Sequence, residues 1–492
     1  MTPGARPTPP VPFPVREGGE DTPSPRPSPR GRGGEDRRSQ PPAPPFPERE
    51  GGLGGLGPPR VLLLMSTRTY RAKAFLAAAR RLGAAVVVGS ERGQALARHA
   101  PGTTVAVDLA HPERAARQIA AFATTRPLAA VVGVDDDTTL VAALAAEALG
   151  LPHNPVEAVR ASRDKYLARQ RFAAAGLPSP RFALVPLDSD PALAAREAPY
   201  PCVLKPVALA ASRGVIRADD PDEFVAAFRR IAALLAADGG HATHLLVESF
   251  LPGPEVALEG LLHEGALHVL ALFDKPDPLD GPYFEETLYV TPSRLPAATQ
   301  AAIAATAGRA AAALGLRDGP LHAELRLGAD GPYVLEVAAR SIGGLCSNAL
   351  RFGTGLSLEE LILRHTLATH AATADALALP AREQQAAGAM MLPIPRAGTL
   401  RAVRGRAEAL AVPGVEEVTI TIPLGQSVVP LPEGDRYLGF VFARGATPAA
   451  VEAALREAHR RLRFVITAPG EPEEAAECLP AAPARRVLPI RG

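Results

Sequence analysis

The sequence predicts a chain of several α/β and α+β domains, and three observations lead to this prediction. The 492 residues suffice for about three domains of ~150 residues each. Hydrophobic residues make up 47% of the chain and charged residues 21%, as in globular proteins with buried cores. From residue 60 onward, short apolar runs alternate with helical stretches, which is the pattern of βαβ units around a parallel sheet.

The charge balance and the cysteine content exclude several classes of protein. Lys and Arg total 53 against 52 Asp and Glu, so the net charge of +1 provides no overall basic field for nucleic acid or an anionic membrane. Three cysteines without a CxxC spacing argue against a disulfide framework or zinc fingers, and favour a reducing, cytoplasmic compartment. No apolar run approaches the ~20 residues of a membrane span, and the N-terminus does not resemble a signal peptide. We therefore expect neither a nucleic-acid partner nor a membrane.

Residues 1–59 are predicted to be a disordered leader. They hold 17 of the 52 prolines and 11 of the 44 glycines, with few large apolar residues to offset the entropy of ordering. A near repeat, PFPVREGG at 12–19 and PFPEREGG at 45–52, is compatible with a proline-rich docking arm. We favour the disordered leader, or an upstream extension that does not belong to the native chain.

Residues 60–155 are predicted to form a parallel α/β domain. The turn after its first strand lacks a GxGxxG sequence, which disfavours a dinucleotide site. Asp135–Asp137 follow a strand, where such sheets bind ligands, but they are equally compatible with a solvated loop that caps the next helix. The predicted elements are strands at 61–65, 84–88 and 129–134 and helices at about 70–82 and 138–149.

Two lysines in the next segment are candidates for phosphate contacts. Lys165 lies on a helix that is predicted to run unbroken over 156–175. Lys205 interrupts a short apolar strand, where a charge needs either a path to water or an anion. The loop 207–215 offers backbone N–H groups and the Ser212 hydroxyl to phosphates. Alone, each lysine would be expected to be an exposed charge.

An acidic strand follows the loop. Glu248 lies near the end of a strand over 245–251, and Glu255 comes seven residues later, after a Pro-Gly-Pro turn. With the two lysines and two later acids, seven motifs stand in order, namely Lys165, Lys205-Pro206, Ser212–Val215, Glu248 with Leu251, Pro252–Glu255, Glu324 and Glu336. In this order they resemble the ATP-grasp enzymes, and the resemblance covers about residues 60–370.

The resemblance implies an ATP-grasp fold over 156–375, with ATP between two α+β subdomains. Lys165 and Lys205 would then bind the phosphates, and the loop around Ser212 would close over them. The resemblance also implies that the Glu248–Leu251 segment contacts the adenine and that Glu255 contacts the ribose hydroxyls.

Strands at 321–327 and 333–340 flank a Gly-Ala-Asp-Gly turn and form a predicted hairpin. Glu324 and Glu336 lie on its facing strands, and close carboxylates repel unless a cation lies between them. Hard oxygen ligands beside phosphates suit Mg²⁺, with Mn²⁺ as a substitute. The alternative is a surface hairpin with cross-strand Glu–Arg pairs, which we would favour without the upstream lysines.

Alternation along these strands predicts where each side chain points. His322 and Glu324 share one face, while Leu335 and Val337 are expected opposite Glu336.

Arg340 is the candidate catalytic residue. Its guanidinium stays charged and presents a planar set of donors, which suits an acyl phosphate and the tetrahedral state that follows. The sequence Glu-x-Ala-x-Arg, followed by Gly343-Gly344, resembles the amino-acid (dipeptide) ligase branch of the family.

The long polar loop 273–286 resembles the same branch. It carries aromatic residues beside acids, which suits a pocket for a zwitterion, and Glu286 is the candidate for the ammonium of an amine substrate. The acids are equally compatible with capping and solvating the loop.

Residues 384–467 are predicted to form a small α+β lid domain, similar to those at the end of amino-acid ligases, with one helix over 447–462. We predict no chemistry in it. Residues 468–492 are rich in Pro and Ala and are predicted to be frayed.

The predicted function is an ATP-dependent carboxylate–amine ligase that forms an acyl phosphate and releases ADP and phosphate. Its partners would be a small carboxylate and a small amine, and the sequence leaves open whether the chain forms a homodimer. Two alternatives remain at this point. One is an ATP-grasp enzyme with another acceptor, such as a purine-pathway ligase or a biotin-carboxylase-like enzyme, and the other is an ATP-binding regulatory module without turnover.

Overall fold

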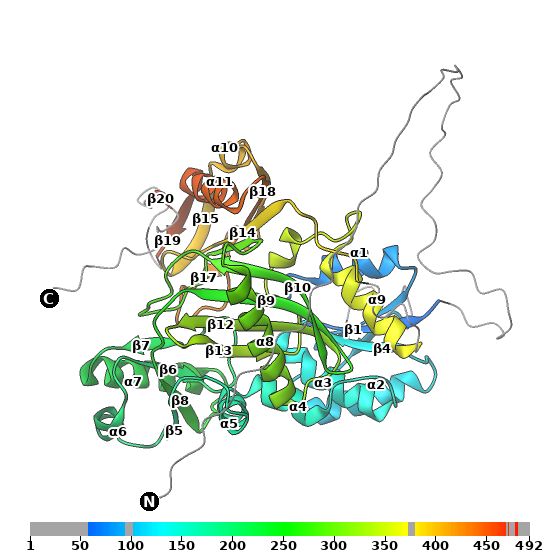
Figure 1. Ribbon diagram of the computed structural model, residues 1–492, viewed down its shortest axis with the longest axis horizontal. Helices are drawn as coiled ribbons and strands as arrows, with labels where there is room; N and C mark the ends of the chain where they lie inside the picture. The colour runs from blue at the N-terminus through cyan, green and yellow to red at the C-terminus, as the bar shows by residue number, and fades with distance from the viewer. Residues whose placement is uncertain (1–57, 94–101, 372–378, 469–470, 472–477, 481–492) are drawn as a thin grey trace, which may run out of the picture. The chain divides into compact units, whose positions relative to one another are not determined.

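Four β-sheets, joined by helices, organise the part of the chain that the computed structural model describes (Figure 1). That part comprises residues 58–93, 102–371, 379–468, 471 and 478–480. The predicted leader, except for its last two residues, and most of the predicted tail lie outside it. None of the helices in these ranges combines the length and apolar character needed to cross a bilayer.

The first sheet is parallel, as predicted. Its region comprises β1 (Arg60–Leu64), α1 (Ala72–Arg81), β2 (Ala85–Ser90), β3 (Thr104–Ala106), α2 (Pro112–Ala123), β4 (Ala130–Gly133) and α3 (Asp136–Ala148). The strands lie in the order β3-β2-β1-β4. Val61 and Leu63 of β1 join the core with α1 and α9 (Leu358–His370), whereas its Leu62 joins the core with α2 and α3. Helices therefore cover both faces of β1, which explains its unbroken apolar run.

The helix predicted over 156–175 is two helices, α4 (Val156–Arg163) and α5 (Lys165–Ala174). The prediction of one helix was wrong because Asp164 between them is extended, with φ −106° and ψ 105°. Its carboxylate accepts the N–H of Leu167 at 2.8 Å and caps α5. The break places Lys165 at the first residue of α5, where its own N–H donates to Val207 O at 3.0 Å.

A small antiparallel sheet carries Lys205. Its region comprises β5 (Phe182–Pro186), α6 (Pro191–Glu197), β6 (Cys202–Pro206), β7 (Ile216–Ala218), α7 (Pro221–Ala237) and β8 (His244–Ser249). The strand order is β5-β8-β6-β7, and α6 and α7 share its core. Because side chains alternate along β6, Cys202 and Leu204 enter that core, while Val203 and Lys205 face the cavity described below.

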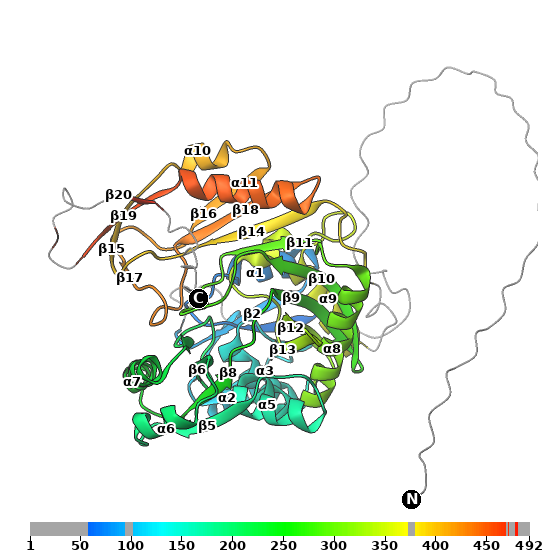
Figure 2. The same ribbon diagram turned by 60° about the vertical axis from the view of Figure 1, so that its left-hand side comes forward.

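The largest sheet has eight strands in the order β13-β12-β9-β10-β11-β14-β18-β16. Its region comprises β9 (Glu255–His263), β10 (Ala266–Lys275), β11 (Leu288–Thr291), α8 (Ala297–Leu314), β12 (Gly319–Gly328), β13 (Gly331–Ala338), a 3-10 turn (Cys346–Ala349), α9, β14 (Ala386–Leu392), β16 (Val415–Ile420), β18 (Gly439–Gly445) and α11 (Pro448–Arg461). Strands from the C-terminal region thus continue the sheet of the central region, and α11 lies along β14 and β18 (Figure 2).

The fourth sheet has the order β17-β15-β19-β20. Its region comprises β15 (Gly398–Arg404), α10 (Arg406–Leu410), β17 (Ser427–Val428), β19 (Arg463–Thr467) and β20 (Cys478–Pro480). Because β20 pairs with β19, the prediction of a frayed chain was wrong for residues 478–480.

The predicted hairpin is confirmed as β12 and β13, with Glu324 directly opposite Glu336. A β-bulge next to this pair adds one residue to β13. Val334 and Val337 therefore enter the core, whereas Leu335 joins Glu336 on the lining of the cavity. The prediction that Leu335 shares the face of Val337 was wrong, because strict alternation holds only in a strand without a bulge.

Candidate active site

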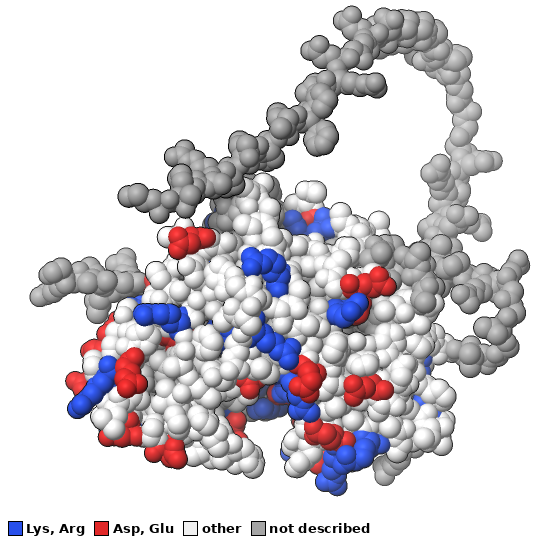
Figure 3. Space-filling model, turned by 60° about the horizontal axis from the view of Figure 1, so that its bottom comes forward, with Lys and Arg blue, Asp and Glu red and all other residues white. Residues whose placement is uncertain are grey.

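One cavity of about 520 Å³ collects every residue that the sequence singled out for chemistry. The predicted site residues on its lining are Lys165, Lys205, Ser212, Glu248, Leu251, Glu255, Glu286, Glu324, Glu336 and Arg340. They come from the start of α5, from the small and large sheets and from loops next to these strands, so the folded chain brings together residues up to 175 positions apart. On the face shown in Figure 3, basic and acidic side chains lie interspersed rather than forming one basic surface.

Lys205 belongs to a buried triad with Glu248 and Arg169. Glu248 accepts from Lys205 Nζ at 2.6 Å and from Arg169 Nε at 2.7 Å, and all three residues are buried. Burial opposes the charge on Glu248, but the two cations outweigh it and lower the pKa of this carboxyl. Burial lowers the pKa of Lys205, and Glu248 opposes that shift. The triad holds the Lys205 ammonium at one wall of the cavity.

Lys165 reaches the same wall from the start of α5. Its Nζ donates to Leu209 O at 2.7 Å and lies 3.6 Å from Glu336 Oε2. The first contact ties Lys165 to the loop that carries Ser212. That loop contacts the C-terminal region, because the Gly214 N–H donates to Pro432 O at 2.8 Å.

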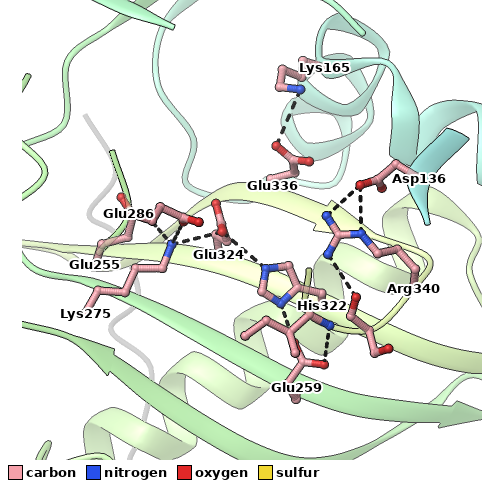
Figure 4. A network of polar contacts seen from close by, with 12 residues as sticks. Asp136, Lys165, Glu255, Glu259, Lys275, Glu286, His322, Glu324, Glu336 and Arg340 are labelled. Atoms are coloured by element: carbon pink, nitrogen blue, oxygen red, sulfur yellow. Dashed lines mark hydrogen bonds and ion pairs between the residues drawn. The ribbon is translucent and has the colours of Figure 1, made fainter. Parts of the chain in front are cut away.

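A second buried cluster centres on Lys275, whose side chain is 2% exposed (Figure 4). Its Nζ lies 2.7 Å from Glu255 and 3.0 Å from Glu324, and it also bonds Glu286. Burial works against the ammonium, but the three carboxylates raise the pKa of Lys275. Burial, followed by the charge of Glu324, raises the pKa of Glu286 to about 7.

The predicted ribose ligand, Glu255, also pairs with Arg326, whose Nε lies 3.2 Å away. Arg326 Nη1 donates to Leu251 O at 2.6 Å, so the Leu251 end of the predicted adenine segment is fixed to the hairpin. The rings of Phe250 and Phe284 lie 5.2 and 5.8 Å from the Arg326 guanidinium, measured to the ring centres.

Two groups of carboxylates are chemically suited to a cation. Glu324 and Glu336 face each other across the hairpin and line the cavity, which fits a divalent ion with hard oxygen ligands. Oxygen atoms of Glu255, Glu286 and Glu324 lie within 4.8 Å of one another, with the Lys275 ammonium among them. In this arrangement Lys275 itself supplies the positive charge for that trio.

Glu324 is oriented by His322, whose Nε2 lies 3.3 Å from its Oε1. His322 Nδ1 bonds the fully buried Glu259, which also accepts the Ile342 N–H at 2.9 Å. Burial disfavours the imidazolium, but Glu259 raises the pKa of His322 to about 9.

Arg340 pairs with Asp136 at the start of α3, with Nε and Nη2 at 2.9 and 2.8 Å from Oδ2 (Figure 4). Burial opposes the charge of Arg340, but Asp136 raises the pKa of this guanidinium. This pair joins the first sheet to the residues that follow β13. Of the two interpretations of the acidic run Asp135–Asp137, the helix cap is confirmed, since Asp135 is the N-cap of α3. All three residues line the cavity, and their binding of a ligand stays a prediction.

Sequence reasoning missed several polar residues of the cavity. Lys275 opens the loop that was singled out for its acids, and His322 shares a predicted face with Glu324, so both had a local signal. Asp435–Tyr437 also line the cavity. Their signal is a charged run between two strands. The C-terminal region, for which we predict no chemistry, thus contributes to the wall of the cavity.

Comparisons with known proteins identify the domains of the chain. Family models match three segments, namely the ATP-grasp N-terminal domain over 76–153, the ATP-grasp domain over 198–349 and the L-amino acid ligase C-terminal domain 2 over 390–467. The fold and the site together therefore define an ATP-grasp protein.

Individual relatives extend this result. A D-alanine–D-alanine ligase of Aromatoleum aromaticum is 34% identical over 197 residues, which are 39% of this chain and 61% of that protein. A D-alanine–D-alanine ligase of Cupriavidus taiwanensis is 30% identical over 232 residues, covering 44% of this chain and 68% of that one. The chain belongs to the ATP-grasp family. It spans less than two thirds of the first of these relatives.

The crystal structure of an L-amino acid ligase from Bacillus licheniformis matches with a TM-score of 0.69 and 27% identity, over 84% of this chain and 100% of that one. Together with the C-terminal family match, this likeness places the chain beside the amino-acid ligases of the family.

Proposed function

We propose that the protein is an ATP-dependent ligase that joins the carboxylate of one amino acid to the amine of another. The convergence of all ten predicted site residues on one cavity carries this proposal. Two lysines on one wall, two facing carboxylates and a partly buried guanidinium form the charge pattern needed to transfer a phosphoryl group to a carboxylate. The relatives named above support the choice of amino acids as substrates.

In the proposed reaction, an oxygen of the donor carboxylate attacks the γ-phosphorus of ATP, and the bond to ADP breaks. The acceptor amine then attacks the carbonyl carbon of the acyl phosphate, and phosphate leaves. Lys165 and Lys205 would hold the phosphate charges in place, and the loop of Ser212 would cover them. Arg340 would stabilise the charge that develops on the acyl phosphate and on the tetrahedral state.

The nucleotide base and sugar would lie along the Glu248–Leu251 segment and Glu255. Glu248 has a second task in this proposal, because its carboxylate fixes the Lys205 ammonium. Glu286 would face the ammonium of an amine substrate.

The facing carboxylates of Glu324 and Glu336 are the residues that would hold Mg²⁺ or Mn²⁺. When bound there, the ion would neutralise phosphate charge during the transfer. The Glu259–His322 pair would keep Glu324 in position for this role.

The test is a screen of amino-acid pairs with ATP and Mg²⁺, with ADP measured by a coupled assay and products by mass spectrometry. We expect ADP release that depends on a pair of amino acids, together with the corresponding dipeptide. ADP release that depends on bicarbonate, without a dipeptide, would instead indicate a carboxylase-type enzyme. ATP binding without turnover for any candidate acid would indicate a regulatory module. Either result would overturn the proposed function.

A further inference from the structure

The C-terminal region contributes one basic side chain to the cavity that has no partner in the described part of the chain. Nine basic side chains line the cavity, and eight of them form a hydrogen bond or ion pair with a carboxylate or a carbonyl oxygen. The ninth, Arg436, is partly buried, and no described residue accepts a hydrogen bond from it or pairs with it. Because removing a charge from water costs free energy unless the charge is paired, this guanidinium favours an anion that enters the cavity.

The acids near Arg436 in the sequence are already paired with arginines of other regions. Glu433 accepts from Arg230 of α7 at 2.5 and 2.9 Å, and Asp435 pairs with Arg68, which follows β1, at 3.4 Å. These contacts fix the segment that carries Arg436 to both the small-sheet region and the first-sheet region. The segment is therefore held at the cavity, while Arg436 itself stays available to a ligand.

Arg436 and Glu286 approach the cavity from the two sides of β14. On one side, the carbonyl of the residue after Glu286 accepts the Met391 N–H at 2.8 Å. On the other side, the Leu438 N–H, two residues after Arg436, donates to Leu392 O at 2.9 Å. Since neighbouring strands lie ~4.8 Å apart, the backbones that flank β14 here are roughly 10 Å apart. Both side chains line the same cavity, so a small molecule between them can contact both.

Tyr437, the residue after Arg436, also connects this segment with Glu286. Burial raises the pKa of Tyr437, and the charges of Glu286 and Glu285 raise it further, which agrees with acids close to its hydroxyl. Tyr437 lines the cavity as well. A carboxylate and a guanidinium thus lie near each other on one lining. An α-amino acid carries the complementary ammonium and carboxylate.

We propose that Arg436 binds the carboxylate of the acceptor amino acid whose ammonium faces Glu286. This inference rests on the proposed function and adds a ligand for the second charge of the acceptor. In the proposed reaction the donor carboxylate becomes the amide, whereas the acceptor keeps its carboxylate from binding until the dipeptide leaves. A guanidinium suits this contact because it stays charged and offers two parallel N–H donors to the two oxygens. Arg436 would therefore select acceptors with a free carboxylate.

The kinetic test uses a pair of different amino acids, whose order in the dipeptide identifies the donor and the acceptor. In Arg436→Gln we expect the acceptor KM to rise about 10- to 100-fold, because a charged hydrogen-bonded pair is lost, while the KM values of ATP and of the donor change less than about twofold. Arg436→Lys keeps the charge without the planar set of donors and should fall between Arg436→Gln and wild type. Arg117→Gln, at an exposed position of α2 outside the cavity lining, is the matched control and should leave all three values unchanged.

An acceptor without a carboxylate tests the contact directly. Wild type should use the acceptor at least about tenfold better than its amide, by kcat/KM, whereas Arg436→Gln should use the two within about threefold of each other. Calorimetry in the presence of ADP gives the same comparison without turnover. The standard L-amino acids are titrated first, and the strongest ligand is then compared with its amide. The donor site is the same in wild type and variant, so a difference between them in this preference reports on Arg436.

The outcomes separate this inference from the proposed function. Failure of every pair to yield a dipeptide would overturn the function, whereas the calorimetric comparison would still decide whether Arg436 binds a carboxylate. The assignment of Arg436 is wrong if no amino acid binds wild type, if Arg436→Gln retains the preference for the amino acid over its amide, or if the donor KM rises instead of the acceptor KM. A rise confined to the KM of ATP would assign Arg436 to phosphate and would also overturn it. Since no described residue pairs with Arg436, the unfolding midpoint of Arg436→Gln should stay near that of wild type, which separates loss of binding from loss of the fold.

Discussion

Replacing Lys275 by methionine would remove one cation from among three carboxylates, of which one is buried and two are partly buried. The lysine Nζ lies 2.7 Å from Glu255 and 3.0 Å from Glu324 and also bonds Glu286. Methionine has a similar length and fills irregular space well, so the effect of the substitution would be mainly electrostatic.

The contacts of Lys275 give the size of this effect. Without the ammonium, three carboxylates this close cannot all remain ionised, and the pKa of Glu286 is already about 7 in the wild type. The added loss in the variant therefore comes mainly from Glu255 and Glu324, which lose their cation. We therefore expect the free energy of unfolding to fall by about 3–5 kcal/mol at neutral pH, as when one partner of a buried ion pair is removed.

The pH dependence has a definite sign. In the folded variant the carboxyl pKa would lie above its unfolded value, so protonation of that carboxyl stabilises the fold. The variant's loss of unfolding free energy relative to wild type therefore grows as the pH rises above about 4.5. Urea unfolding of wild type and Lys275→Met at about pH 5 and about pH 7 measures this difference. Lys73→Met, at an exposed position of α1, is the matched control and should change little.

A divalent cation should partly restore the Lys275→Met variant, because oxygens of the three carboxylates lie within 4.8 Å of one another. Two results for Lys275→Met would refute this electrostatic explanation. One is an unfolding midpoint equal to that of wild type at neutral pH, and the other is a greater loss of unfolding free energy at acidic than at neutral pH.

Three further predictions concern the other charged groups. Glu248→Gln should lower the free energy of unfolding by about 3–5 kcal/mol in urea at neutral pH, because two buried cations lose their partner; the exposed Glu157→Gln should have little effect. Since the pKa of Glu248 is lowered on folding, its contribution to the free energy of unfolding should be lost as the pH falls below about 4.5. A difference in that free energy between wild type and Glu248→Gln that persists at lower pH would contradict this prediction. Arg340→Ala should reduce kcat about 10²- to 10³-fold with a much smaller change in ATP affinity, measured by steady-state kinetics and nucleotide titration, and the reverse pattern would contradict its role at the reacting phosphate. Glu336→Gln should abolish turnover while circular dichroism and the unfolding midpoint stay near wild type, and turnover that survives would remove Glu336 from the metal pair.

Local pattern was sufficient to predict much of the fold. The parallel first sheet followed from apolar runs separated by helical stretches, and the β12–β13 hairpin followed from two alternating strands around a Gly-Ala-Asp-Gly turn. Such patterns can be recognised in a sequence because strand and helix periodicity depend on residues only a few positions apart. The ATP-grasp motifs could likewise be placed in order, since each is a short segment. Their roles as ligands remain predictions.

Contacts between distant segments could not be predicted in the same way. The extended Asp164 that divides α4 from α5 and the bulge that turns Leu335 toward the cavity are single-residue departures from periodicity. Both depend on what packs around the residue, for example on the bond between the Lys165 N–H and Val207 O.

The composition and order of residues were thus enough to define the family, the charged side chains available for chemistry, and the strands that carry them. Only the folded chain determined which of those charges meet: Lys275 with three glutamates, Arg340 with Asp136, and Glu248 with Lys205 and Arg169. The physical reason is that the pairing of buried charges depends on distances of a few ångströms between segments far apart in sequence, and no local pattern records those distances.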